Sequence, residues 1–146
     1  MIKCKYFGIK ELVSKAVYNK YGEKALMFFD EDVLLDLDTI RLNFGSEIII
    51  NNWASGGNLS QCGLRENTSQ IVKDNTSKNN IYCSAHCMGK GFDLHAKNGK
   101  NELLYNVVLT LIQLKKLRKF RRLENFKNTG TWVHVDCFQS DYTIVF

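Results

Sequence analysis

One segment organises the rest of this chain: Ser84-Ala85-His86-Cys87-Met88-Gly89-Lys90-Gly91-Phe92-Asp93-Leu94-His95. His86 and Asp93 are separated by six residues, and two of these, Gly89 and Gly91, are glycines. Glycine tolerates the backbone angles of tight turns, so this spacing predicts a strand, a turn after His86, and a second strand that brings Asp93 back beside it.

A second segment near the end of the chain, Thr131-Trp132-Val133-His134-Val135-Asp136, offers another imidazole. Apolar and polar residues alternate here as in a half-buried strand, so His134 is expected to point away from its two valine neighbours. Two imidazoles and one carboxylate can converge on a metal ion. Three N/O ligands leave a fourth position for water, which is typical of catalytic rather than structural zinc. The alternatives are histidines with structural roles and a turn role for Asp93.

The two segments together carry a family resemblance. The pattern Ser-x-His-x-x-Gly-x-Gly-x-Asp-Leu, followed by Trp-Val-His-Val-Asp, resembles the zinc peptidases of cell-wall metabolism. That family includes D-Ala-D-Ala carboxypeptidases, vancomycin-resistance dipeptidases, phage L-alanyl-D-glutamate endopeptidases and the related Hedgehog signalling domain. The resemblance covers residues 40–138, because residues 48–53 and Gly63-Leu64-Arg65 look like the family's first strand and its GxR segment. It implies one zinc ion bound by His86, Asp93 and His134.

The resemblance also suggests residues that contact substrate. In the family an arginine at the position of Arg65 binds a substrate carboxylate, a task that suits the fork of a guanidinium. The alternative is an ordinary surface arginine. Ser84 is a candidate hydrogen-bond donor to substrate, and Trp132 is either a wall of the site or part of the core.

Peptide hydrolysis requires a group that moves protons between water and the leaving amine. Many relatives carry an acid three residues before the last histidine, where this chain has Thr131. Glu124 and Asp136 are the remaining candidates. We favour Glu124 as the base, because a hairpin would bring it to the metal while a residue two along the strand lies about 6–7 Å away. Asp136 is the alternative base, or it orients a ligand.

Length and composition predict a single domain, residues 1–146, with 45% hydrophobic and 12% aromatic residues. No apolar run approaches the length that crosses a bilayer, and the first residues lack the features of a signal peptide. We therefore expect no membrane association and a cytoplasmic monomer. A wall-cutting enzyme of this kind would act after release through a lysing host membrane, or as part of a virion.

The cysteines raise a competing hypothesis. The odd number of five, without a secretion signal, predicts free thiols. Cys83 and Cys87 flank His86, which suggests a structural Cys/His zinc site, but a second pair at similar spacing is missing. The simpler interpretation is that both are small buried residues. His95 fits no ligand pattern and is expected to play a structural role near the ligands.

A basic run accounts for much of the net charge of +5. Its members are Lys115, Lys116, Arg118, Lys119, Arg121 and Arg122. The run is either the solvated face of a helix or a surface that attracts an anionic wall polymer or nucleic acid. No nucleic-acid-binding motif accompanies it, so nucleic acid is not an expected partner.

Periodicity predicts an α+β domain with a small antiparallel sheet and helices packed on one side. The expected helices are 9–21, 30–44 with Asp30 as its cap, a short one near 69–73, and 101–119. The expected strands are 47–51, 121–126 and 131–138 joined by a turn at 128–130, and an edge strand at 142–146.

Three hypotheses of function follow. The first is a zinc peptidase that hydrolyses peptidoglycan stem peptides, as carboxypeptidase or endopeptidase, in phage-derived wall lysis. The second is a catalytically inactive zinc-binding module of the same fold that binds a partner or the cell wall. The third is a basic interaction domain without metal.

Overall fold

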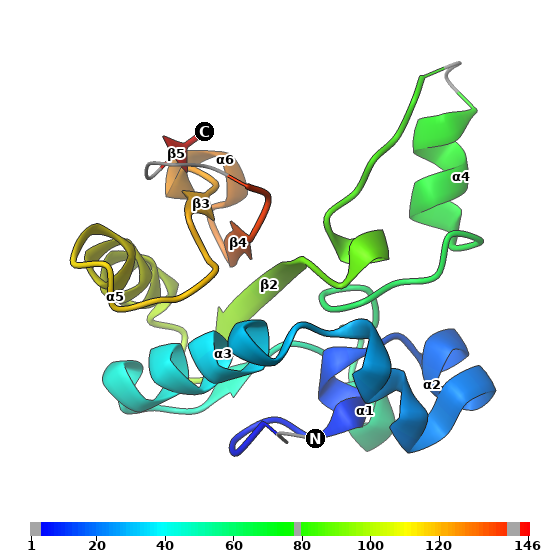
Figure 1. Ribbon diagram of the computed structural model, residues 1–146, viewed down its shortest axis with the longest axis horizontal. Helices are drawn as coiled ribbons and strands as arrows, with labels where there is room; N and C mark the ends of the chain where they lie inside the picture. The colour runs from blue at the N-terminus through cyan, green and yellow to red at the C-terminus, as the bar shows by residue number, and fades with distance from the viewer. Residues whose placement is uncertain (1–3, 78–79, 140–143) are drawn as a thin grey trace.

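The computed structural model describes residues 4–77, 80–139 and 144–146, which form helices around one small sheet (Figure 1). The strands are β1 (Ile48–Ile49), β2 (Gly91–Ala96), β3 (Arg122–Leu123), β4 (Val133–Asp136) and β5 (Ile144–Val145). The α-helices are α1 (Ile9–Leu12), α2 (Lys15–Tyr21), α3 (Glu31–Phe44), α4 (Gln70–Thr76), α5 (Asn101–Gln113) and α6 (Phe126–Thr129). Three short 3-10 helices are η1 (Gly22–Phe28), η2 (Trp53–Ser55) and η3 (His86–Met88).

The strands lie in the order β1-β2-β4-β3-β5. The first four pair antiparallel, which confirms the predicted α+β class with a small antiparallel sheet. The expected edge strand at 142–146 is observed as β5, which pairs parallel to β3; Tyr142 and Thr143 lie outside the described residues. The register places Asp93 of β2 directly opposite His134 of β4.

Alternation along the central strands separates a core face from a polar face. Phe92 and Leu94 on β2, and Val133 and Val135 on β4, are fully buried. They join residues of α3 and α5 in one hydrophobic cluster. Each such side chain contributes about 1.5–3 kcal/mol by leaving water. The residues between them must therefore project from the opposite face of the sheet.

Helix α3 matches its prediction. Asp30 caps it by accepting a hydrogen bond from the backbone N–H of Asp32 at 2.9 Å, and acidic residues occupy the first turn, where the helix dipole favours them. Gly45 ends the helix with a positive φ of 72°.

The predicted helix at 9–21 is wrong as a single element, because Val13 and Ser14 interrupt it. Ser14 begins α2 by accepting a hydrogen bond from the N–H of Val17, and Val13 forms a bridge with Leu64. This pairing is tight: a Cβ on Gly63 would lie 2.1 Å from the carbonyl oxygen of Leu12. The interruption anchors the segment around Leu64 to the N-terminal helices.

The predicted helix at 101–119 is too long, since α5 ends at Gln113 and Leu114 is 62% exposed. The following loop is held by Asp36, a buried residue of α3. Its carboxylate accepts backbone N–H bonds from Arg118, Lys119 and Phe120 at 2.7, 2.7 and 3.1 Å. These bonds take the chain off the helix axis and direct it toward β3.

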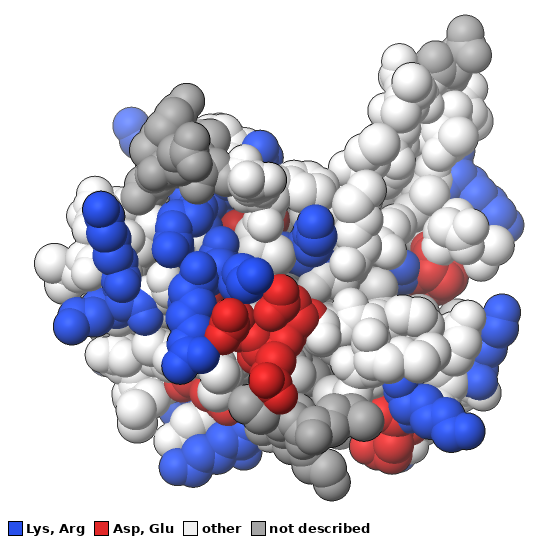
Figure 2. Space-filling model, viewed as in Figure 1, with Lys and Arg blue, Asp and Glu red and all other residues white. Residues whose placement is uncertain are grey.

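The basic run consequently lies on this loop and on β3 instead of on a helix face. Arg118 pairs with Asp32 at 2.6 Å, and Lys119 pairs with Asp30 at 3.0 Å. On the face of the molecule shown in Figure 2, Lys and Arg gather on the side where α5 lies, directly beside a group of Asp and Glu. Acidic neighbours therefore offset part of the basic charge.

Three shorter segments also differ from expectation. His86 lies on η3 and not on a strand, and the expected turn at 128–130 largely belongs to α6. The strand predicted at 47–51 is only two residues long, as β1. The short helix expected near 69–73 is α4, which projects from the rest of the molecule (Figure 1). In the parts of the chain that are described, no helix has the length and apolar character required to cross a membrane.

Candidate metal centre

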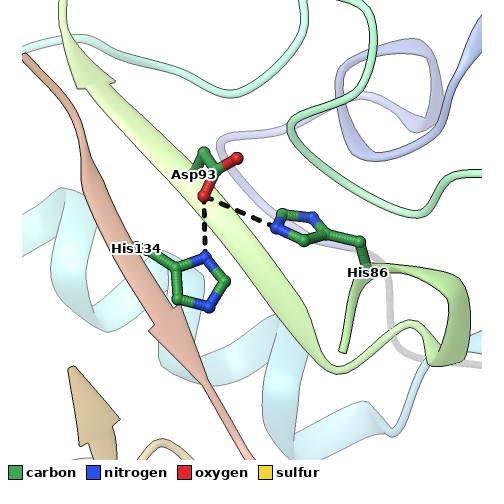
Figure 3. Close-up of side chains that lie close together, drawn as sticks. All are labelled: His86, Asp93 and His134. Atoms are coloured by element: carbon green, nitrogen blue, oxygen red, sulfur yellow. Dashed lines mark hydrogen bonds and ion pairs between the residues drawn. The ribbon is translucent and has the colours of Figure 1, made fainter. Parts of the chain in front are cut away.

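His86, Asp93 and His134 converge, as their motifs predict. One potential ligand atom from each lies within 4.8 Å of the other two. They come from η3, β2 and β4, and Figure 3 shows both imidazoles directed at the Asp93 carboxylate. This group could bind a metal ion.

The protein backbone orients His86. Its Nδ1 lies 3.0 Å from the carbonyl oxygen of Gly63. A carbonyl only accepts hydrogen bonds, so Nδ1 carries a proton, and in a neutral ring the lone pair that would bind a metal ion is therefore on Nε2. Nε2 lies 3.5 Å from Oδ1 of Asp93. The ring is thus held with Nε2 toward the other two residues. Metal-binding histidines are commonly oriented in this way, by a hydrogen bond from the other ring nitrogen to a backbone carbonyl.

Two carboxylates flank His134. Nδ1 lies 2.7 Å from Oδ1 of Asp93, and Nε2 lies 3.6 Å from Oδ2 of Asp136. Burial by itself lowers the pKa of His134, but the hydrogen bonds to Asp136 and Asp93 outweigh it and raise the pKa to about 9. Without metal, this imidazole is therefore protonated at neutral pH.

Asp93 is ionised in the same arrangement. Burial opposes its charge, yet the hydrogen bonds to His134 and His86 hold its pKa well below the usual range. Nη2 of Arg65 lies 3.9 Å from Oδ2 of Asp93 and adds positive charge on the other side. The carboxylate is thus charged and available as a ligand throughout the neutral range.

Asp136 has its own partners. The residue is 2% exposed, and its carboxylate lies 3.0 Å from Nε of Arg122 and accepts the N–H of Phe138 at 3.0 Å. Together with the contact to His134, these bonds occupy it on several sides. The arrangement favours the orienting role for Asp136 over the role of base.

Glu124 lies across the strand pair from His134. Its backbone N–H donates to the carbonyl of His134 at 3.0 Å, which continues the antiparallel register of β3 and β4. Its half-buried side chain lines the same cleft as the three candidate ligands. Thr131, which lies three residues before His134, is exposed. The geometry thus brings Glu124, and not Thr131, to the site.

The ligands open onto a cleft of about 320 Å³. Both remaining substrate-binding candidates, Ser84 and Trp132, line it. Ser84 is buried, and Trp132 lies against His95 with ring centroids 6.4 Å apart. The residues that sequence reasoning did not assign to the cleft include Arg122, Phe138 and Phe146. They are far apart in sequence and follow no motif, so only the β3–β4–β5 arrangement reveals them.

Arg65 reaches the cleft but is 6% exposed. Nη2 donates to the carbonyl of Gln61 at 2.7 Å and also faces Asp93. This guanidinium is therefore mostly buried beside Asp93, where it forms part of the wall of the cleft.

The cysteines do not belong to the group of potential ligands. All five are free thiols, and Cys83 is exposed, so the expectation that it is buried is wrong. Cys87 is half-buried beside His86. Cys62 lies 3.7 Å from Nε2 of His95, and burial lowers the pKa of that histidine. His95 therefore has the structural position expected of it.

Fold and site together define an α+β protein with a candidate His/Asp/His metal centre on the polar face of its sheet. Comparisons of the chain with family models, with curated proteins and with solved structures find no match. The functional argument accordingly depends on the site itself.

Proposed function

We propose that this protein is a zinc-dependent peptidase that hydrolyses the stem peptides of peptidoglycan. The observation that carries the proposal is the convergence of His86, Asp93 and His134, with Glu124 beside them on the same cleft. The motif resemblance to cell-wall zinc peptidases adds support, and it supplies the substrate class.

The donor set fits zinc. Two imidazole nitrogens and one carboxylate oxygen are ligands that zinc accepts, and three protein ligands are typical of its catalytic sites. His86 would bind through Nε2, and His134 through Nδ1 once that nitrogen has lost its proton. A bound zinc ion would supply a Lewis acid for the peptide carbonyl and lower the pKa of a water to about 7.

The chain's own residues would move the protons and hold the peptide. Glu124 would take a proton from the attacking water and return it to the leaving amine. Asp136 would hold His134 in its ligand orientation. Ser84 and Trp132 would contact the peptide backbone along the cleft.

The biological setting follows from the resemblance to phage endopeptidases. We place the activity in phage-derived lysis of the bacterial wall, by a monomer that meets peptidoglycan after release from the host cytoplasm or as part of a virion. The basic residues of the loop would favour approach to an anionic wall.

An inactive zinc-binding module is the second candidate. It is favoured by Thr131, which replaces the acid found in many relatives. In that case the site would bind zinc and a partner without cutting peptides. The two candidates differ in one measurable property, which is peptide release per bound zinc.

The test measures zinc by elemental mass spectrometry and stem-peptide cleavage by mass spectrometry of digested peptidoglycan. We expect one zinc per chain in the wild type and loss of zinc in His86→Ala, Asp93→Ala and His134→Ala. His95→Ala is the matched control, because His95 shares β2 with Asp93 but is outside the ligand group. Full zinc retention in two of the three ligand variants would refute the site. Zinc binding without cleavage of any wall type would favour the inactive module.

A further inference from the structure

Arg122 is a second arginine on the metal cleft, and its surroundings differ from those of Arg65. Its guanidinium carbon lies over two phenyl rings, 4.7 Å from the centroid of Phe146 and 5.5 Å from that of Phe138. Stacking of this kind restrains a guanidinium and leaves its edge free for planar anions. Arg122 is thus held in place before any ligand arrives.

The ion pair with Asp136 restrains the same side chain from one direction. Within the described part of the chain, the hydrogen bond of the Arg122 guanidinium to Asp136 comes from Nε. The side chain remains 29% exposed, whereas that of Asp136 is 2% exposed. Arg122 lines the cleft, so it borders the space where a peptide would lie.

The strand register also places Arg122 close to the candidate metal ligands. Arg122 lies opposite Asp136 in the β3–β4 register, and Asp136 contacts Nε2 of His134 at 3.6 Å. Phe146, which covers the guanidinium, lies 6.2 Å from the His134 ring. Asp136 therefore contacts both the Arg122 guanidinium and His134 of the candidate metal centre. An anion bound to Arg122 would lie close to the peptide bond that is cut.

We propose that Arg122 binds a carboxylate of the substrate and determines which stem peptides are cut. The inference rests on the proposed peptidase function, whose substrate class it narrows to peptides with a free carboxylate near the scissile bond. Arg65 is less suited, because it is almost fully buried and already bound to Gln61 and Asp93.

Two carboxylates of a stem peptide have this chemistry. One is the carboxylate at the end of the peptide, which would make the enzyme a carboxypeptidase. The other is the α-carboxylate of a γ-linked glutamate within the peptide, which would fit an endopeptidase. Amidation of one or the other removes the charge while keeping the shape, so the two sources can be distinguished.

The experiment uses four synthetic stem peptides, with each of the two carboxyl groups present as acid or as amide. For zinc-loaded wild type, we expect amidation of one of them to lower kcat/KM by about 10- to 100-fold, the effect of losing a charge-assisted pair. Arg122→Gln should show the same loss on the acid and no further loss on the amide. Arg118→Gln, with the same charge change outside the cleft, should behave as wild type.

Calorimetric binding of the same peptides gives a readout without catalysis. Wild type should bind the acid about 10- to 100-fold more tightly than the amide, and Arg122→Gln should bind both equally. Binding with this preference but without cleavage would overturn the peptidase proposal, and with it the selection of the peptides to be cut, while carboxylate binding by Arg122 would stand. Equal binding of acids and amides by wild type, or a preference retained in Arg122→Gln, would overturn the role of Arg122.

Arg122 also neutralises Asp136, so zinc content is measured in every variant. If Arg122→Gln loses zinc or fails to fold, Phe138→Leu takes its place. This change removes one ring from the stack while the ion pair and the backbone bond to Asp136 remain. Partial loss of the preference for the acid, at unchanged zinc content, is then the expected result. An unchanged preference would count against the proposal.

Discussion

Zinc binding is expected to depend steeply on pH, because the metal and a proton compete for His134. Its pKa is about 9 in the metal-free protein, owing to Asp136 and Asp93. A pH of 7 is about two units below that pKa, and one pKa unit corresponds to 1.36 kcal/mol. Removing the proton therefore costs about 3 kcal/mol, or about 100-fold in zinc affinity at pH 7.

The assay is a competition titration with a chelator of known affinity at several pH values between 6 and 10. Corrected for the chelator and for ionisation of the zinc-bound water, affinity should rise about tenfold per pH unit and level off near pH 9. Calorimetry in two buffers of different ionisation enthalpy should show at least one proton released per zinc at pH 7, because His134 loses its proton and a zinc-bound water adds to the release. Asp93 should contribute no proton, since its pKa is held far below this range.

Asp136→Asn tests the cause. It replaces a charged acceptor of His134 with a neutral one, which lowers the pKa of His134, so the plateau should begin at a lower pH. As pH rises, the stability of the metal-free wild type should fall while its zinc affinity increases. A raised pKa stabilises the fold below the unfolded value of 6.5, and this contribution is lost as pH rises through about 9. Zinc affinity that is flat between pH 7 and 9, with no proton release, would refute the reasoning.

The other predictions concern catalysis, the thiols and the fold. Glu124→Gln should keep zinc and lose about 10²–10⁴-fold in rate, measured as peptide release per bound zinc; full activity would remove Glu124 as the base. Changing both Cys83 and Cys87 to Ser should leave zinc bound, and a metal-free double variant would instead support a Cys/His site. Asp36→Ala should lower the free energy of unfolding in urea by about 2–4 kcal/mol, because it leaves backbone N–H groups of the following loop without their acceptor. Asp32→Ala, which breaks an exposed ion pair in the first turn of the same helix, should cost about 0–1 kcal/mol, and equal effects of the two changes would contradict the role of Asp36.

Local chemistry in the sequence was sufficient to predict the three candidate ligands and the class of fold. Alternation around His134 predicted which face of its strand it occupies, because successive side chains of a strand point to opposite sides. The spacing of His86 and Asp93 around two glycines predicted their return to one place. Gly89 has the positive φ of 66° that such a turn requires, and a Cβ on Gly91 would lie 2.8 Å from that of Ala85. The capping residues of α3 likewise act within a few residues of themselves.

Sequence reasoning failed where a distant segment decides the local structure. Helical periodicity continues past Gln113, yet the chain leaves the helix because Asp36, far away in sequence, binds the backbone of residues 118–120. Periodicity also continues through Val13, where pairing with Leu64 breaks the helix. Hydrogen bonds to remote partners outweigh helix propensities, which differ by less than about 1 kcal/mol per residue for residues other than proline.

The candidate site divides in the same way. Side-chain types and their spacing determined which residues can bind a metal, since imidazole and carboxylate chemistry belongs to the residues themselves. The tertiary structure alone decided how they are held: the Gly63 carbonyl selects the ligand nitrogen of His86, and Asp136 is occupied by Arg122. It also buried Arg65 while leaving Arg122 on the cleft. The burial and orientation of a charged side chain depend on which segments pack around it, and no local pattern records that packing.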